Sequence, residues 1–293
     1  MAYAGWRSLT HEEDSVPVML TPTCQTLPSG LFCRYWCPDN EVRGAVIVVH
    51  GLGEHSGRYQ ALAEVLAARG LVVMALDHPG HGESPGHRVF IRHFDEFLTG
   101  VRECREHLLG VQPDAPCFIL GHSMGGLIVS RLLLEDQHHY RGALLSGPAF
   151  EAGEPPSPIL LKVVGLLAKL LPRLGVMALD SRGVSRDPRV VETYDKDPLV
   201  NHGKVTAGLA HALLTTMAAV LDRAEEITLP LLVMHGAADS MAAPAGAEKF
   251  VAQVGSQDLT FTLLPELYHE IFNEPEGPQI MGAFADWIDA RLP

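Results

Sequence analysis

A serine between two glycines is the most suggestive chemical feature of this sequence. Residues 121–125 are Gly-His-Ser-Met-Gly, which fits the G-x-S-x-G pattern of a nucleophile elbow. An apolar run at 118–120 predicts a buried strand before it, and a helical pattern follows to residue 134. Such a strand-to-helix turn lifts the hydroxyl above the sheet and directs a helix N-terminus at a developing negative charge. We therefore predict that Ser123 is a nucleophile; the alternative is a glycine-rich loop whose serine caps the helix.

A serine hydroxyl needs a neighbouring base, and chain order narrows the choice of histidine. In hydrolases with this elbow, an acid and then a histidine follow the serine along the chain. Asp239 comes just after the apolar run 231–235, whereas Asp222 precedes that run and fits poorly. His269 is the only histidine of the 15 that lies beyond Asp239, and it follows the predicted strand 259–264. We predict His269 as the base, oriented by Asp239; an ordinary loop histidine is the alternative.

Two backbone amides are candidates for holding the oxyanion of an acyl-transfer reaction. One belongs to Met124, the residue after the predicted nucleophile. The other belongs to Leu52, in the His-Gly-Leu-Gly loop that follows the apolar run 45–49. The glycines on each side of Leu52 would let a substrate carbonyl approach this backbone closely. His50 would shape the loop without a chemical role.

The segments that would position these residues alternate between strand and helix. Short apolar runs such as 45–49 and 71–76 suit parallel strands buried on both faces. The alternation lapses from 151 to about 225, after which it returns. We therefore predict a mostly parallel, doubly wound α/β sheet from residues 1–150 and 226–293, with residues 151–225 inserted as a helical cap. The remaining predicted strands are 31–37, 117–120 and 142–146, and the predicted helices are 59–69, 94–109, 124–134, 244–254 and one ending near 292.

Composition excludes several classes of protein. Lys and Arg total 22 against 35 for Asp and Glu, and this net charge of −13 disfavours nucleic acid as a partner. No run of 18 apolar residues predicts a transmembrane helix, and residues 1–14 lack the apolar core of a secretory signal. Five loosely spaced cysteines suggest reduced thiols, so we expect a cytoplasmic protein.

No pattern for a cofactor or metal is present. The sequence lacks a GxGxxG motif that opens a βαβ unit, and it lacks a P-loop. The histidine pairs His78 with His81 and His138 with His139 have no cysteine or carboxylate at ligand spacing. We expect neither a cofactor nor a metal.

Several longer motifs give the chain a family resemblance: residues 50–59, 77–84, 121–126, 185–188 and 194–199. It resembles the monoacylglycerol lipases, in the monoglyceride lipase and lysophospholipase group of the α/β-hydrolase superfamily, over nearly its whole length. The resemblance implies an α/β-hydrolase fold, the triad and oxyanion amides named above, and monoacylglycerol as substrate. A lysophospholipase or general carboxylesterase is the near alternative, and a non-catalytic binding protein on the same fold is the remote one.

The resemblance also implies polar groups for the glycerol head of the substrate. These are Glu54, Arg58 and, from the cap, Tyr194. A structural ion pair is the alternative for Glu54 and Arg58. Some relatives carry a second histidine three residues after the catalytic one, where this chain has Phe272. That difference removes a polar contact and weakens the expectation of strict monoacylglycerol preference.

The cap carries one unusually apolar stretch. From Ile159 to Leu171 the only charged residues are Lys162 and Lys169, which are seven apart and share one helix face. We predict a lid that lines the acyl site and rests on a membrane surface, so the protein would be cytoplasmic with peripheral membrane contact. The alternative is a cap helix packed on the core or on a partner subunit.

Overall fold

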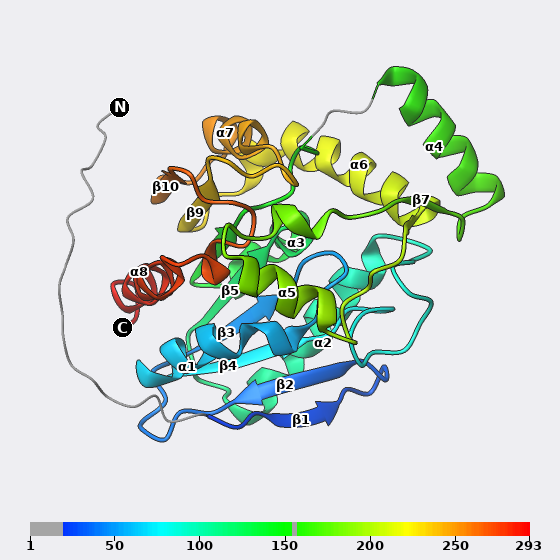
Figure 1. Cartoon of the computed structure of the whole chain (residues 1–293). Helices are drawn as coiled ribbons and strands as arrows, with labels where there is room; N and C mark the ends of the chain where they lie inside the picture. The colour runs from blue at the N-terminus through cyan, green and yellow to red at the C-terminus, as the bar shows by residue number, and fades with distance from the viewer. Residues whose placement is uncertain (1–19, 154–156) are drawn as a thin grey trace.

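One central sheet of eight strands organises the protein. The structure is a computed structural model that describes residues 20–153 and 157–293. The strands follow the order β1, β2, β4, β3, β5, β6, β9, β10; those from β4 to β10 run parallel, whereas β1 and β2 are antiparallel to their neighbours (Figure 1). The mostly parallel sheet predicted from the sequence is confirmed. Its strands are β1 (Thr23–Thr26), β2 (Phe32–Trp36), β3 (Gly44–Val49), β4 (Leu71–Leu76), β5 (Cys117–His122), β6 (Gly142–Ser146), β9 (Leu231–Gly236) and β10 (Leu259–Leu264).

The central strands are buried on both faces, as their apolar sequences require. Every residue of β3, β4, β5, β6 and β9 is buried. Along β3 the side chains alternate: Ala45, Ile47 and Val49 belong to one apolar cluster, and Val46 and Val48 to the other. A slip of one residue would exchange these two sets, so burial fixes the register and with it the position of each strand end.

Helices cover both faces of this sheet. The helices α2, α3 and α7 contribute Phe97, Leu127 and Phe250 to one cluster. On the other face, α1 and α8 contribute Leu62 and Phe284 (Figure 1). The core helices are α1 (Gln60–Ala68), α2 (Asp95–Val111), α3 (Met124–Asp136), α7 (Pro244–Gln253) and α8 (Gly277–Asp289), with 3₁₀ turns η1 (Ser56–Tyr59), η2 (Gln137–His139), η4 (Ala224–Glu226) and η5 (Ile271–Asn273).

A long insertion separates β6 from β9. Its last helix, α6, packs on α3 and places Leu209, Leu213 and Val220 in the same apolar cluster as the sheet. The boundary predicted at residue 225 therefore assigns to the cap a helix that shares the main core; the division at 151 and 225 remains a prediction. The insertion contains α4 (Pro158–Leu170), β7 (Gly175–Met177), η3 (Ser181–Gly183), α5 (Pro188–Lys196), β8 (Val205–Thr206) and α6 (Ala207–Asp222).

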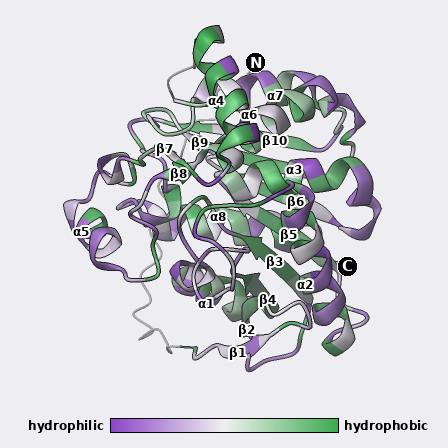
Figure 2. Ribbon diagram, turned by 90° about the vertical axis from the view of Figure 1, so that its right-hand side faces the viewer, coloured by the Kyte–Doolittle hydropathy of each residue, from purple (hydrophilic) through white to green (hydrophobic). Residues whose placement is uncertain are grey.

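The helix α4 stands apart from the rest of the insertion. It packs on α6 through Val164, which is 8% exposed, and projects from the body of the molecule (Figure 1). Figure 2 shows it as a strongly hydrophobic ribbon at the edge of the protein. In the described residues, every exposed large apolar side chain except Val111 and Leu263 lies between Ile159 and Met177.

The structure adds some elements that the sequence analysis lacked. The strand β1 is an exposed, polar edge strand, and β5 continues two residues beyond the predicted end at 120. The interpretation of residues 1–14 and of the prolines at 155 and 156 falls outside the described residues. No helix in the described part is long and apolar enough to cross a membrane. All five cysteines lie in that part, and none is bonded to another.

Candidate active site

Ser123 lies at a strained turn between β5 and α3. Its backbone has φ 54° and ψ −119°, a conformation that non-glycine residues rarely adopt and that often marks functional sites. The turn is also tight. A Cβ atom on Gly121 would lie 2.4 Å from the Gly125 carbonyl oxygen, and one on Gly125 would lie 1.9 Å from that of Val49. Since only glycine fits at these two positions, the motif at 121–125 has a steric explanation in the fold.

His269 lies in the loop after β10 and connects the serine to an acid. Its Nε2 atom is 2.8 Å from Oγ of Ser123, and its Nδ1 atom is 2.6 Å from Oδ2 of Asp239. Burial alone would lower the pKa of His269, but the charge of Asp239 and the hydrogen bond to it raise the pKa above its usual value. This chain of contacts is what activation of a serine hydroxyl requires.

Asp239 follows β9, and both of its carboxylate oxygens are engaged. Oδ1 accepts hydrogen bonds from the amides of Met241 at 2.8 Å and Ala242 at 3.0 Å. Oδ2 faces His269 and also His235. Burial opposes the charge, but the attraction of His269 and the hydrogen bond with His235 hold the pKa of Asp239 well below its usual range. The ionised carboxylate holds the His269 tautomer whose Nε2 atom accepts the serine proton.

The insertion supports the loop that carries His269. The amide of His269 donates a hydrogen bond to the carbonyl of Gly183, in η3, at 3.3 Å. Just beyond the loop, the buried carboxylate of Glu274 accepts a hydrogen bond from the amide of Tyr268 at 2.7 Å. It also accepts one from Nε of Arg186, in the insertion, at 3.1 Å. The position of the imidazole thus depends on the insertion as well as on the sheet.

The two predicted oxyanion amides lie at the N-terminus of α3 and in the turn after β3. Met124 is the first residue of α3, where a backbone N–H has no acceptor within its own helix. Leu52 lies in the turn after β3, and no hydrogen bond between described residues has its amide as donor. Glu54 shapes this turn by accepting a hydrogen bond from the amide of Gly51 at 2.6 Å. His50 also shapes it, since its Nδ1 atom is 2.7 Å from the Gly51 carbonyl oxygen.

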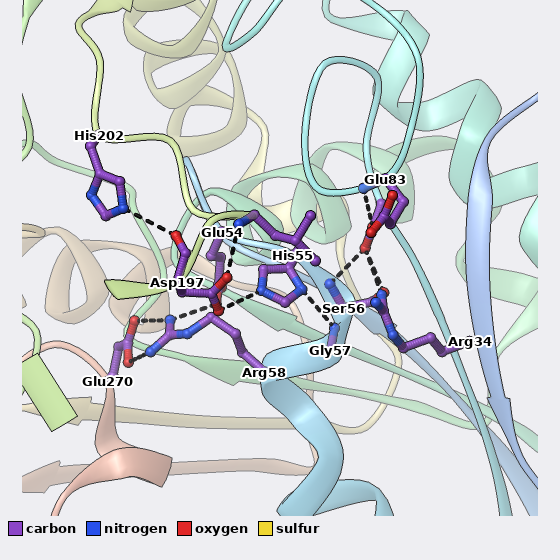
Figure 3. A network of polar contacts seen from close by, with 12 residues as sticks. Arg34, Glu54, His55, Ser56, Gly57, Arg58, Glu83, Asp197, His202 and Glu270 are labelled. Atoms are coloured by element: carbon purple, nitrogen blue, oxygen red, sulfur yellow. Dashed lines mark hydrogen bonds and ion pairs between the residues drawn. The ribbon is translucent and has the colours of Figure 1, made fainter. Parts of the chain in front are cut away.

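Two of the residues proposed for the glycerol head, Glu54 and Arg58, form a buried polar network with Glu270 (Figure 3). Arg58 donates to Glu54 at 2.9 Å and makes a two-point contact with Glu270, in which Nη2 lies 2.7 Å from Oε2. Tyr59 donates to Glu54 at 2.7 Å, and the guanidinium of Arg58 lies 4.7 Å from the ring centre of Tyr194, on α5. Burial opposes the charge of Glu54, but Arg58 lowers the pKa of this carboxyl to about 2. The sequence-derived alternative of an ion pair between Glu54 and Arg58 therefore describes this structure accurately.

A second polar contact joins the core to the insertion. His55 places its Nε2 atom 2.9 Å from Oδ2 of Asp197, just after α5 (Figure 3). The amide of Asn201 donates to the carbonyl of Gly53 at 2.7 Å. The turn that carries Leu52 is thereby held between the sheet and the insertion.

The structure brings all eight predicted site residues into one region, but two of their partners were missed. Glu270 binds Arg58. It directly follows the predicted base His269 in the sequence, and that position could have marked it as a residue of the site. His235 contacts Asp239 from the end of β9. Its position at the end of a predicted strand could have marked it in the same way. A pocket beside the site is lined by Glu54, Arg58 and Glu270 of the polar network and by Phe272.

The first histidine pair of the sequence packs in the protein interior. His78 and His81 are buried and pack with His50 at ring-centre distances of 4.3 and 5.4 Å from it. Within residues 20–153 and 157–293, no three His, Cys, Asp or Glu side chains are grouped as a metal site would require.

Known proteins resemble the chain along most of its length. The family model described as serine aminopeptidase, S33, matches residues 40–276. A monoacylglycerol lipase of Mycolicibacterium smegmatis is 43% identical over 88% of this chain and 92% of its own length. The monoglyceride lipase of Rattus norvegicus is 36% identical over 89% of this chain and 88% of its own. The crystal structure of the Paleococcus ferrophilus monoacylglycerol lipase superposes with a TM-score of 0.81 and 32% identity, covering 89% of this chain and 99% of that one.

These likenesses agree with the site geometry, because the serine, histidine and carboxylate meet where a hydrolase of this superfamily needs them. The identities and coverages are high enough to assign a family as well as a fold. The chain belongs to the monoacylglycerol lipase group of the α/β-hydrolase superfamily.

Proposed function

We propose that the protein hydrolyses monoacylglycerols to a fatty acid and glycerol through an acyl-enzyme on Ser123. The observation that carries this proposal is the continuous contact from Oγ of Ser123 through His269 to Asp239, at 2.8 and 2.6 Å. The names of the relatives in M. smegmatis and R. norvegicus support the choice of substrate.

The first chemical step is attack of Ser123 on the acyl carbonyl. His269 removes the hydroxyl proton through Nε2 as the Oγ–C bond forms, and Asp239 stabilises the resulting imidazolium. The amides of Leu52 and Met124 donate hydrogen bonds to the carbonyl oxygen as it becomes an oxyanion. Loss of one such donor lowers the rate about 100- to 1,000-fold in other serine hydrolases.

The second half of the reaction uses the same groups. His269 returns the proton to the leaving glycerol oxygen as the ester C–O bond breaks. A water molecule then attacks the acyl-enzyme while His269 takes its proton, and Ser123 leaves with a proton from the imidazolium. The reaction consumes one water and leaves the enzyme unchanged.

The polar network suits a neutral polyol better than a charged head group. Glu54 and Glu270 both pair with Arg58, so each carboxylate is already engaged by a cation. A peptide N-terminus, as an aminopeptidase would bind, needs a carboxylate that is not already engaged by a cation. The hydroxyl of Tyr194 can still exchange hydrogen bonds with the hydroxyl groups of a polyol. We therefore favour ester cleavage over the peptidase activity named in the family description.

Peripheral membrane contact through α4 is a second part of the proposal. Ile159, Leu166 and Leu170 are 76, 57 and 67% exposed, which is costly in water and favourable in a lipid interface. Lys162 and Lys169 give the same helix positive charge that anionic lipids attract. A helix with these properties would place the site next to the layer in which its substrate dissolves.

A comparison of substrates tests the proposal. We expect kcat/KM to be highest for 1- and 2-monoacylglycerols, lower for diacylglycerol, lysophosphatidylcholine and short aryl esters, and negligible for aminoacyl anilides. Ser123→Ala should abolish both turnover and labelling by a fluorophosphonate probe. Persistent labelling of that variant would refute the nucleophile, and a preference for lysophosphatidylcholine would refute the substrate.

A further inference from the structure

A second histidine contacts the acid of the triad. His235 lies in β9, four residues before Asp239, and is completely buried. Its Nε2 atom is 3.0 Å from Oδ2 of Asp239, the same oxygen that faces Nδ1 of His269. The mechanism above gives this histidine no part, and neither the chain order nor the motif explains it.

The surroundings of His235 determine where its proton lies. Besides Asp239, the Nε2 atom is 3.1 Å from the carbonyl oxygen of Ala242, which can only accept a hydrogen bond. Both neighbours of Nε2 are therefore acceptors, so Nε2 carries a hydrogen. On the other side of the ring, Nδ1 has no hydrogen-bond partner among the described residues. The ring is thus a donor aimed at the carboxylate, whatever the charge of the imidazole.

This donor completes the coordination of the carboxylate. Oδ1 accepts from the amides of Met241 and Ala242, and Oδ2 accepts from His269 and His235. Four donors around one buried carboxylate leave it little freedom to rotate. A hydrogen bond to the charged form also makes a carboxylate less basic. The proton that His269 takes from the serine then stays on the imidazole, where the leaving group can receive it.

We propose that His235 is a positioning residue that orients Asp239 and moderates its pull on His269. The inference rests on the proposed function, since it assigns His235 a role within that reaction. It concerns the side chain of His235 alone, because the two amides that bind Oδ1 belong to the backbone and remain in any variant.

The rate of ester turnover should reveal this role through its pH dependence. His269 is faced by Asp239, by His122 at the end of β5, by the adjoining Glu270 and by Glu54 after β3. Of these groups only Asp239 contacts His235, so it is the one whose basicity changes when His235 is replaced. Removal of the donor makes Asp239 more basic, so the imidazolium of His269 is stabilised and its pKa rises. The acidic limb of kcat/KM, which reports the neutral base, should then move to higher pH.

Three variants separate the hydrogen bond from the volume of the side chain. In His235→Gln, the amide nitrogen reaches the place of Nε2, so we expect the wild-type pH profile to within a few tenths of a pH unit. His235→Asn is polar but reaches only the place of Nδ1, and His235→Leu has no donor. For these two we expect the acidic limb to move up by about one pH unit and kcat to fall about tenfold, with KM unchanged. An Asn profile that superposes on the wild type, or a Gln profile displaced like that of Leu, would overturn the inference.

A spectroscopic measurement on the unaltered protein avoids any question of folding. The ¹⁵N chemical shifts of the His235 ring distinguish a protonated Nε2 from a bare one. We expect a protonated Nε2 at pH 8; a bare Nε2 would refute the inference. The measurement needs no substrate, so it tests the hydrogen bond even if wild-type protein were to fail on monoacylglycerol and thereby refute the proposed function alone.

Discussion

The buried polar network of Glu54, Arg58 and Glu270, called the floor of the active site below, differs from the helix α4 in which kind of side chain it buries. Beside the triad, charged side chains are buried: Glu54 and Glu270 are about 5% exposed and Arg58 is 11% exposed. On α4, leucines are exposed instead, and Leu170 reaches 67%. Ordinary folding would favour the reverse of both arrangements, because charges are costly to bury and apolar side chains are costly to expose.

The two exceptions have different physical remedies. In the floor, the free-energy cost of burying charges is offset by pairing, since each buried charge has a partner of opposite sign within hydrogen-bond distance. Among residues 20–153 and 157–293 the helix α4 has no such remedy, because only one of its faces packs on α6. Contact with a lipid interface, as proposed above, would relieve this cost. We therefore expect substitutions in the floor to change folding and chemistry, and substitutions on the outer face of α4 to change neither.

The largest effect should come from the acid of the triad. In Asp239→Asn, the side-chain oxygen can still accept from the Met241 and Ala242 amides, so the fold should persist. The new amide hydrogens, however, no longer favour the His269 tautomer that serves Ser123. We expect kcat to fall about 10,000-fold, measured with a short aryl ester.

The control for that variant is Asp222→Asn, an exposed aspartate at the end of α6 that has no contact with the site. Its turnover should equal that of the wild type. If Asp239→Asn retained near-normal turnover, a different carboxylate would have to be the acid.

A charge removed from the floor should destabilise the whole fold. Arg58→Met keeps the length of the side chain but leaves Glu54 and Glu270 buried without a cation. Loss of one partner from a buried ion pair costs about 3–5 kcal/mol, which urea denaturation would detect as a lower midpoint. Adding Glu270→Gln should recover part of the loss. The exposed pair of Arg223 with Glu226 is the contrast, and Arg223→Ala should leave the midpoint unchanged.

Buried histidines near the site should make stability depend on pH. Burial lowers the pKa of His50 and His78, and burial followed by neighbouring charges lowers that of His81 to about 3 and of His122 to about 4. The unfolded chain therefore binds more protons than the folded one below about pH 6.5, and stability falls with decreasing pH by up to about 1.4 kcal/mol per pH unit for each histidine. Below about pH 4.5 the loss should steepen, because Glu54 and Asp239 also have lowered pKa values.

His269 has the opposite sign. Its pKa is raised, so its contribution is present below pH 6.5 and is lost as the pH rises through its folded pKa. Urea denaturation at pH 7.5, 6.5 and 5.5 measures the balance of these effects. A free energy of unfolding that did not decrease toward pH 5.5 would contradict the neutral, buried state of the four histidines. His81→Gln should make the decrease shallower.

The sequence predicted the triad because each of its members follows a recognisable element. Buried parallel strands are apolar runs, and their carboxyl ends meet at one edge of the sheet. The elbow motif, the chain order of serine, acid and histidine, and these strand ends together placed Ser123, Asp239 and His269 near one another. The same reasoning could not find β1, whose four residues are polar and exposed on an edge strand.

The features that could not be predicted from the sequence are mainly contacts between residues far apart in the chain. Arg58 and Glu270 are 212 positions apart, and nothing in the local pattern of either residue indicates the other. The sequence prediction includes α6 in the cap because strands and helices do not alternate between residues 151 and 225, yet the apolar side of α6 packs into the main core. A pattern shows that a face is apolar; only the fold shows which surface covers it.

The outer face of α4 should show the smallest and most selective effect. Leu166 and Leu170 are exposed, whereas Val164 on the same helix is buried against the core cluster. In Leu166→Ser with Leu170→Ser, we expect the urea midpoint and the turnover of a soluble short-chain ester to stay unchanged. Binding to phosphatidylcholine vesicles should weaken about thirtyfold, since each of the two leucines contributes on the order of 1 kcal/mol when a lipid interface covers it. Val164→Ser should do the reverse, lowering the midpoint because a buried apolar contact is lost. Unchanged vesicle binding in the leucine variant would show that the exposed face of α4 serves another surface, such as a partner subunit, and sedimentation of the same variant would then reveal a change in oligomeric state.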